Sequence, residues 1–307
     1  MTANSDVVVR TEHLTKHYGK LVAVDDLNLE VHRGQVFGFL GPNGAGKSTT
    51  MCMMLGLIAP TSGNIEVFGL SVKSNLADIL CKIGAVMESP GFYPYLSGWD
   101  NLKVFARISS DVTDNRIKDV LNLVDLADRA QDKFSGYSQG MKQRLAIACA
   151  LLHDPEFIIF DEPTSGLDPA GMKEVRELII KLGQEGKTIF LNSHLLHEVE
   201  LVCNHVAIIK KGKVIASGVP SDLIKHGDTL QIRVTDTDKA VALLNEEDWV
   251  SSIAREGDLL ILKAPTERAT DISALLAKNG VFVSEMKARE DSLESIFLEL
   301  TEEETVD

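Results

Sequence analysis

The sequence predicts an α/β fold in residues 1–227 and a small α+β domain in residues 228–307. Three observations predict this. A buried apolar strand, a glycine-rich loop and a helix follow one another within residues 36–58. Apolar runs of strand length then alternate with amphipathic helical runs up to Ala216. The charge balance changes at Asp228. A chain of 307 residues is long enough to form two such domains.

The negative charge is concentrated in the C-terminal part. From residue 228 onward, 19 acidic residues stand against 8 basic ones, a net charge of −11. The first 227 residues have 26 acidic and 23 basic residues, a net charge of −3. The sequence has no basic stripe of the kind that binds a phosphate backbone, which argues against nucleic acid as a partner.

Targeting segments and metal-binding cysteine patterns are not visible. No apolar run approaches the ~20 residues that cross a bilayer, and residues 1–10 lack the pattern of a signal peptide. The four cysteines are widely spaced, so we expect reduced and mostly buried thiols of a cytosolic protein: Cys52, Cys81, Cys149 and Cys203.

A phosphate-binding loop follows the apolar strand at residues 36–40. Nine residues fit and flank the pattern G-x-x-x-x-G-K-[ST]: Gly41, Pro42, Asn43, Gly44, Ala45, Gly46, Lys47, Ser48 and Thr49. Glycines let main-chain N–H groups approach phosphate oxygens, and the helix at residues 49–58 directs its N-terminus at the anion. We expect Lys47 to reach the β- and γ-phosphates and Ser48 to bind Mg²⁺. The alternative is a glycine-rich turn that fits by chance.

Two acids follow a second buried strand, at residues 157–160. Asp161 and Glu162 lie at its carboxyl end, where ligands bind in open α/β sheets. We expect Asp161 to hold Mg²⁺ through water, and Glu162 to orient or deprotonate the attacking water. The alternative is an acidic turn closed by Pro163.

Four features are open to two interpretations. Tyr18 could stack on an adenine ring or pack a hairpin. Ser138 and Gly140 open a helix, as a second anion site or as an ordinary N-cap. His194, a lone histidine after a strand, is more often structural than catalytic. The loop at residues 89–96, which follows Glu88, carries aromatic side chains that could pack in a core or contact a partner.

In residues 228–307, alternation predicts strands near residues 230–234, 259–262 and 281–283. Helical spacing predicts helices near residues 240–244 and 272–277, and an amphipathic helix at residues 293–300.

In this order, the motifs resemble the nucleotide-binding subunit of ATP-binding cassette (ABC) transporters over about residues 7–225. The resemblance rests on the phosphate loop, Tyr137-Ser138-Gln139-Gly140-Met141 at the signature position, Phe160-Asp161-Glu162-Pro163, Ser165-Gly166-Leu167-Asp168, and His194. It implies a doubly wound P-loop core, an antiparallel β layer and a helical subdomain at about residues 90–152. The implied cofactors are ATP and Mg²⁺.

The resemblance also implies roles for individual residues. Tyr18 falls at the adenine-stacking position, and Ser138, Gly140 and Asp168 would contact nucleotide. Glu162, His194 and Lys47 would be catalytic. Ser48, Glu88 and Asp161 would be the ligands of Mg²⁺.

Two departures from the family pattern resemble the subgroup that exports lantibiotics, bacitracin-like peptides and other drugs. Gln139 stands in place of a signature glycine and Met141 in place of its glutamine, whereas Ser138 and Gly140 are kept. Glu88 stands where the family usually has glutamine. We hypothesise that Glu88 responds to Mg²⁺ and ATP and draws Phe92, Tyr93 and Tyr95 against a permease.

The resemblance implies the ATPase subunit of an exporter, acting with a separate transmembrane permease. It implies a location on the cytoplasmic face of a bacterial cell membrane. A single set of motifs requires a second cassette, either a second copy or a paralogue. One alternative is a soluble ABC-type ATPase that is not coupled to transport. Another is an ATP sensor that does not hydrolyse, against which Glu162 and His194 argue.

Overall fold

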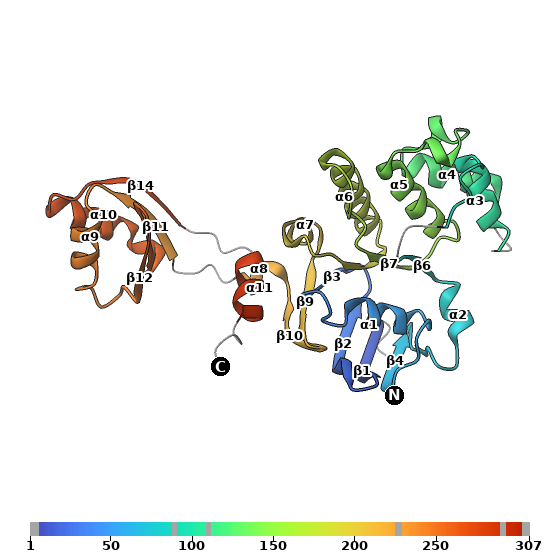
Figure 1. The fold of residues 1–307 in the computed structure, drawn as a ribbon, viewed down its shortest axis with the longest axis horizontal. Helices are drawn as coiled ribbons and strands as arrows, with labels where there is room; N and C mark the ends of the chain where they lie inside the picture. The colour runs from blue at the N-terminus through green and yellow to red at the C-terminus, as the bar shows by residue number, and fades with distance from the viewer. Residues whose placement is uncertain (1–5, 88–90, 109–111, 225–228, 289–292, 303–307) are drawn as a thin grey trace. The chain divides into compact units, whose positions relative to one another are not determined.

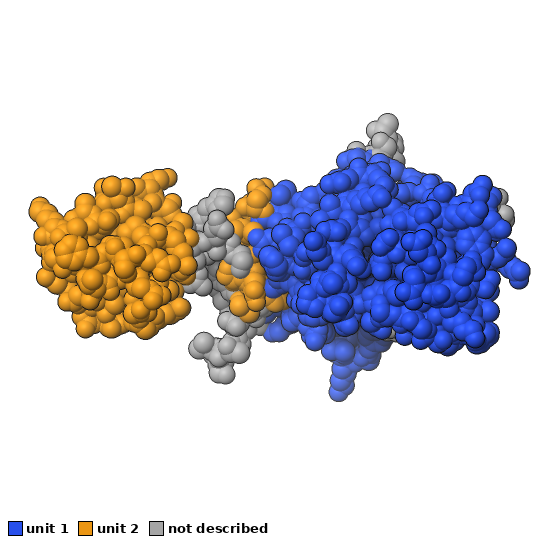
Figure 2. Space-filling view, turned by 90° about the horizontal axis from the view of Figure 1, so that it is seen from above, with its two compact units in different colours: residues 1–220, 299–307 blue, residues 221–298 orange. Residues whose placement is uncertain are grey.

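The computed structural model describes residues 6–87, 91–108, 112–224, 229–288 and 293–302. The chain forms two compact units, which Figure 2 colours separately. Unit 1 comprises Met1–Pro220 and Glu299–Asp307, and unit 2 comprises Ser221–Leu298. The predicted boundary between residues 227 and 228 lies outside the described residues and remains a prediction.

A six-stranded sheet forms the centre of unit 1 (Figure 1). Its order is β10-β9-β3-β8-β7-β6, and every neighbouring pair is parallel except β10 with β9. The strands are β3 (Val36–Leu40), β6 (Ile83–Val86), β7 (Phe157–Asp161), β8 (Thr188–Asn192), β9 (His205–Lys210) and β10 (Lys213–Gly218). The near-continuous apolar runs of β3, β7 and β8 are typical of parallel strands buried on both faces.

Helix α1 (Lys47–Met54) is held between this sheet and a second, antiparallel one. The second sheet has the order β2-β1-β4-β5, with β1 (Val7–Tyr18), β2 (Leu21–His32), β4 (Ser62–Val67) and β5 (Leu70–Ser71). One core cluster joins all three elements: Met51, Met53 and Met54 of α1, Phe37 and Phe39 of β3, Leu14 of β1 and Leu27 of β2. Each such buried side chain stabilises the fold by roughly 1.5–3 kcal/mol, so the start of α1 is fixed relative to both sheets.

The remaining helices of unit 1 connect the strands of the central sheet. They are α2 (Leu76–Leu80), α3 (Gly98–Ala106), α4 (Asp114–Leu123), α5 (Gln139–Ala150), α6 (Pro169–Gln184) and α7 (Leu196–Val202). Two 3₁₀ turns lie at Ala127–Arg129 and Phe134–Gly136. Helices α3, α4 and α5 form the predicted helical subdomain (Figure 1). In the described ranges of the chain, none of the helices has the length and apolar character needed to cross a membrane.

The β1–β2 ladder is irregular around His13 and Asp26. Both residues have a positive φ, of 50° and 53°, which is uncommon for residues other than glycine. The pairing register shifts on both sides of Leu14, between Thr11 and Lys16. Such bulges bend a strand and increase its twist.

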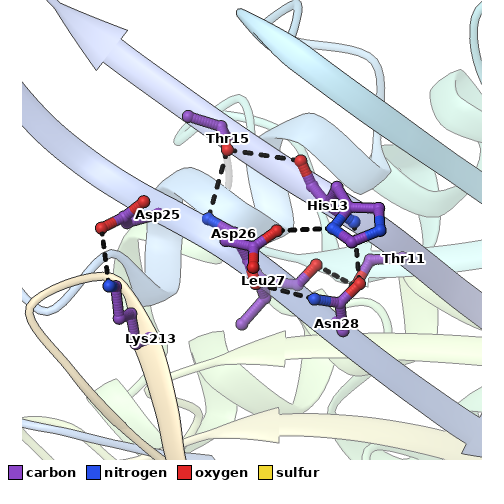
Figure 3. A network of polar contacts seen from close by, with 8 residues as sticks. All are labelled: Thr11, His13, Thr15, Asp25, Asp26, Leu27, Asn28 and Lys213. Carbon is purple, nitrogen blue, oxygen red and sulfur yellow. Dashed lines mark hydrogen bonds and ion pairs between the residues drawn. The ribbon is translucent and has the colours of Figure 1, made fainter.

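Side chains replace the ladder bonds that the irregularity removes (Figure 3). The main-chain N–H of His13 donates to Asn28 Oδ1 at 2.8 Å, and that of Asp26 donates to Thr15 Oγ1 at 3.2 Å. His13 Nδ1 donates to Asp26 Oδ1 at 2.7 Å, because a carboxylate can only accept. Below, these four residues are called the bulge network. Beyond it, β1 ends at Tyr18, where the hairpin borders a cavity.

Unit 2 has the split β-α-β arrangement, with two helices and a four-stranded antiparallel sheet of order β12-β13-β11-β14. Its elements are β11 (Thr229–Val234), α9 (Thr237–Leu244), β12 (Ser252–Glu256), β13 (Leu259–Lys263), α10 (Ala269–Lys278) and β14 (Val283–Ala288). Helices α8 (Pro220–Leu223) and α11 (Leu293–Glu302) include residues of both units. Strand β12 was not expected, because its sequence has no apolar alternation and only Ile253 packs, partly buried, against the core.

The expectation that the cysteines are mostly buried is wrong. Cys203 is buried, but Cys52 and Cys149 are only partly buried and Cys81 is exposed. Cys81 directly follows the short helix α2, whose only buried residue is Ile79. Burial raises the pKa of the Cys149 thiol to about 12, so this thiol stays protonated at neutral pH.

Candidate nucleotide site

The loop between β3 and α1 has glycines where a side chain would collide with neighbouring main chain. Gly46 has φ 105°, and a Cβ there would lie 2.3 Å from the carbonyl oxygen of Ala23 in β2. A Cβ on Gly41 would lie 2.4 Å from the carbonyl oxygen of Ile209 in β9. The loop therefore packs tightly between strands of both sheets. It leads into the first turn of α1, whose N–H groups have no partner within the helix and can bind an anion.

Lys47 extends across this loop. Its residue is only 7% exposed, and Nζ donates to the carbonyl oxygens of Gly41 at 2.7 Å and Pro42 at 3.1 Å. Burial lowers the pKa of Lys47, whereas the negative charges of Glu162 and Asp161 act to raise it. The ammonium group is thus held at the loop, and the two nearby carboxylates favour its charged form, which binds phosphate oxygens strongly.

Glu162 and His194 form a hydrogen-bonded pair after the ends of β7 and β8. His194 Nδ1 donates to Glu162 Oε2 at 2.6 Å. Glu162 itself has a positive φ of 51°, and its N–H donates to the carbonyl oxygen of Asn192 at 2.9 Å. Such backbone strain persists only where the surrounding structure holds it, and it clusters at functional sites. The carboxylate of Glu162 is therefore held in a defined direction by β8.

The phosphate loop and the two acids face one cavity of about 730 Å³, within the size range of small-molecule sites. The predicted residues that line it are Tyr18, Asn43, Gly44, Gly46, Lys47, Ser48, Thr49, Asp161 and Glu162. Gly41, Pro42 and Ala45 do not line the cavity. They form part of the main chain of the phosphate loop, where the Ala45 N–H donates to the carbonyl oxygen of Pro42 at 3.1 Å. His194 does not line the cavity either, although it bonds Glu162, which does.

Three other predicted residues, at the starts of α5 and α6, do not line this cavity, although Gln139 between Ser138 and Gly140 does. Ser138 caps α5, with Oγ accepting from Met141 N–H at 3.2 Å. Asp168 caps α6, with Oδ1 accepting from Gly171 N–H at 3.1 Å. A Cβ on Gly140 would lie 3.8 Å from Gly171 Cα, so the two helix starts adjoin. The structure thus divides the predicted nucleotide residues into two groups.

The aromatic loop after Glu88 also divides into two parts. Glu88 lies outside the described residues, so its predicted role as a Mg²⁺ ligand remains a prediction. Phe92 is 7% exposed and packs against the rings of Phe105 and Phe134, with ring centroids 5.4 and 5.1 Å away. The hypothesis that Phe92 is drawn against a partner is therefore wrong, because the helical subdomain buries it. Tyr93 and Tyr95 are exposed.

The cavity contains donors that suit Mg²⁺ bound together with nucleotide. The Ser48 hydroxyl and the Asp161 carboxylate line it. Within the residues that the structure describes, no three His, Cys, Asp or Glu side chains gather as a self-sufficient metal site. Mg²⁺ in nucleotide enzymes is usually held by one or two carboxylates, phosphate oxygens and water. One hydroxyl and one carboxylate beside a phosphate loop therefore fit this ion.

Four polar residues that line the cavity were not predicted from the sequence: Gln139, Gln143, Ser165 and Asn192. The sequence around Asn192 did indicate a site residue. It ends an otherwise apolar strand two residues before His194, and a polar residue at the carboxyl end of a parallel strand is a candidate for the site. Gln139 lies in the signature motif but was not assigned to the site, and Gln143 had no signal, because the approach of both depends on how α5 packs against the central sheet.

Known proteins resemble this chain over most of its length. The ABC transporter family matches residues 24–165. The bacitracin transport ATP-binding protein BcrA of Bacillus licheniformis is 42% identical over 297 residues, covering 95% of this chain and 97% of that protein. The uncharacterised ABC transporter ATP-binding protein YhcH of Bacillus subtilis (strain 168) is 41% identical over 298 residues, covering 96% of each chain.

Solved structures have the same fold in unit 1. A dimeric ATP-binding cassette, described as a post-hydrolysis state bound to ADP and phosphate, superposes with a TM-score of 0.62 at 26% identity. The match covers 69% of this chain and 98% of that one. The predicted doubly wound cassette and the predicted family are thus confirmed. The chain belongs to the ABC transporter ATP-binding proteins, which are ATPases that bind nucleotide, dimerise and act with a membrane permease.

Proposed function

We propose that this chain hydrolyses Mg²⁺-bound ATP in the cavity of unit 1 and thereby powers the export of a peptide antibiotic, drug or lipid-like molecule. The observation that carries the catalytic part is the Glu162–His194 pair, joined at 2.6 Å beside the phosphate loop. A base close to the γ-phosphate and held by a second group is the arrangement that hydrolysis requires and that mere binding does not.

Each residue then has a distinct role. Lys47 neutralises the β- and γ-phosphates. Ser48, and Asp161 through water, would hold Mg²⁺, which would offset the charge that develops during transfer. Glu162 orients the attacking water and accepts its proton. His194 keeps the Glu162 carboxylate in place with Nδ1 and leaves its other ring nitrogen for the γ-phosphate. Tyr18 lines the cavity and stacks on the adenine.

A second cassette completes the site. Ser138, Gly140 and Asp168 lie at the adjoining starts of α5 and α6 and do not line the cavity of their own chain. A helix N-terminus attracts phosphate, so these residues suit the nucleotide of a facing cassette. The facing cassette is a second copy of this chain or a paralogue. No nucleic acid takes part, since the chain carries a net charge of −14.

The permease contact includes Tyr93 and Tyr95. Their rings are 43% and 67% exposed, with centroids 5.9 Å apart. Exposed aromatic side chains are enriched in interfaces. Through this contact the chain is held at the cytoplasmic face of a bacterial cell membrane. The similarity to BcrA extends over 95% of the chain and thus includes unit 2, which favours export of a bacitracin-like peptide.

The test is reconstitution with a hydrophobic permease from a neighbouring reading frame. We expect the complex in liposomes to hydrolyse ATP faster when a transported peptide such as bacitracin is added, and Glu162→Gln to remove both basal and stimulated turnover. Transport-independent turnover that persists with every permease tested would instead support a soluble ABC-type ATPase. Normal turnover of Lys47→Ala at saturating ATP and Mg²⁺ would overturn the site assignment itself.

A further inference from the structure

Asn192 has a buried side-chain amide and lies beside the two acids of the site, Asp161 and Glu162. It ends strand β8, is 2% exposed, and pairs in register with Asp161 of β7. Its main-chain carbonyl accepts from Glu162 N–H at 2.9 Å. Its side-chain Nδ2 donates to Asp161 Oδ1. One residue thus contacts both acids, and His194 follows it by two positions.

The orientation of this amide follows from chemistry. An ionised carboxylate can only accept hydrogen bonds, so the Asn192 side chain must present its N–H₂ group to Asp161. The carbonyl oxygen then points elsewhere, and Asn192 Oδ1 is buried without a hydrogen-bond partner in the part of the chain that the structure describes. Leaving such a group unpaired costs about 1–3 kcal/mol. An apolar side chain of similar volume would avoid this cost, as the rest of β8 illustrates with its buried Ile189, Phe190 and Leu191.

This cost in stability is explained if the Asn192 amide has a function in the nucleotide site. We propose that Asn192 is a positioning residue that fixes the Asp161 carboxylate in the orientation needed to hold Mg²⁺. Its N–H₂ group donates to Asp161 Oδ1 and so restrains the rotation of the carboxylate that would hold Mg²⁺ through water. Groups that bond a metal-binding carboxylate commonly change metal affinity or activity by about 10–100-fold when they are removed.

This inference rests on the proposed role of Asp161, so the experiment must separate the two. The readout is the affinity for Mn²⁺, a paramagnetic substitute for Mg²⁺. Free Mn²⁺ is measured by electron paramagnetic resonance while the full chain is titrated in the presence of the non-hydrolysable ATP analogue AMP-PNP. Asn192→Leu keeps the branching at Cγ and the number of heavy atoms of the side chain but has no donor. We expect it to weaken Mn²⁺ binding about 10–100-fold, while affinity for AMP-PNP in EDTA stays within twofold.

Thr188→Val is the matched control. Thr188 lies at the opposite end of the same strand, is 1% exposed, and accepts a hydrogen bond from Gly34 N–H at 3.0 Å. Its substitution removes a buried polar contact from β8 without approaching Asp161, so Mn²⁺ affinity should be unchanged. If Asn192→Leu does not fold, Asn192→Val, which suits a strand, replaces it.

Turnover gives a second readout. If Asn192 orients Asp161, raising Mg²⁺ should restore much of the activity of Asn192→Leu, whereas a loss of packing would not respond to Mg²⁺. Unchanged Mn²⁺ affinity in Asn192→Leu, with a large loss in Asp161→Asn, would overturn the inference alone. Unchanged affinity in Asp161→Asn would overturn the proposed metal role of Asp161 as well.

Discussion

The sheets at the centres of unit 1 and unit 2 differ in where their polar side chains lie. In the six-stranded sheet of unit 1, Asp161 and Asn192 end neighbouring parallel strands, and Glu162 and His194 follow within two residues. In the four-stranded sheet of unit 2, the buried side chains are apolar apart from Thr229, among the residues described there. Both sheets are stabilised by the burial of apolar side chains, but only the sheet of unit 1 brings reactive polar side chains together at one edge.

Strand direction explains the difference. All carboxyl ends of parallel strands meet at one edge, where loops and helix N-termini also converge. Neighbouring antiparallel strands end at opposite edges, so residues that follow them are separated. The acidic side chains that the structure describes in unit 2 accordingly lie on its surface, as in the exposed ion pairs Arg233–Asp258 and Arg255–Asp238. We therefore expect substitutions at strand ends of unit 1 to affect catalysis, and substitutions in unit 2 to affect stability alone.

The largest expected effect is that of Glu162→Gln. Glutamine keeps the shape of the side chain but cannot accept the proton of the attacking water, so turnover should fall by about 10²–10⁴-fold. ATP binding should be retained, and the protein should accumulate as a nucleotide-bound dimer. Phosphate release and size-exclusion chromatography with ATP and Mg²⁺ measure both effects. A monomer at high protein concentration with normal phosphate release would contradict the general-base role and the facing-cassette arrangement.

His194→Ala should have the next largest effect. Removing a donor that acts mainly on the transition state commonly costs about 10²–10³-fold in kcat. ATP affinity should change much less, because the hydrogen bond to Glu162 contributes little to ground-state binding. The comparison to make is kcat from steady-state kinetics against the Kd of a fluorescent ATP analogue. An equal fall in both would mean that His194 contributes packing or uniform binding.

Ile232→Ala tests the expectation that substitutions in unit 2 affect stability alone. Ile232 is fully buried in the core of unit 2, so truncation should destabilise that unit by about 2–5 kcal/mol. Basal ATPase activity should be unchanged. Trp249 packs against this core, and in a Trp99→Phe background its fluorescence reports unfolding of unit 2 in urea. Ile261→Ala, at a half-buried position of the same sheet, is the control and should cost less.

A parallel loss of ATPase activity in Ile232→Ala would contradict the separation of the two units. It would mean that the catalytic edge of unit 1 depends on a folded unit 2.

The sequence was sufficient where the structural requirement is local. The phosphate loop and the strand that ends at Asp161 are continuous segments, so their geometry follows from spacing and residue type. The pairing of Asn192 with Asp161 could not be read in this way, because it depends on the register of two strands 31 positions apart. The choice between core and partner contact for Phe92 could not be made for the same reason, since its burial depends on Phe105 and Phe134.

The bulge network illustrates a further limit of prediction. A hairpin at Tyr18 was one of the two interpretations of that residue, and β1 and β2 form such a hairpin. The positive φ angles of His13 and Asp26 were not expected, because neither is glycine. They follow from a register shift that only the pairing of the two strands reveals.

The smallest expected effect concerns this bulge network, which lies in unit 1 but does not line the cavity. His13 and Asp26 are well exposed, with side chains 80% and 59% accessible, so loss of their contact in His13→Ala should cost only about 0.2–1 kcal/mol. His13→Gly also removes the contact, but glycine adopts φ of 50° without steric cost, so this variant should lose less. Urea unfolding followed at Trp99 measures both, with the exposed neighbour Glu12→Ala as control. ATPase activity should be unchanged in His13→Ala, His13→Gly and Glu12→Ala, because polar side chains of unit 1 that lie away from the carboxyl ends of the parallel strands stabilise the fold and take no part in catalysis. A lower kcat in His13→Gly without lower stability would mean that the bulges position Tyr18 over the nucleotide.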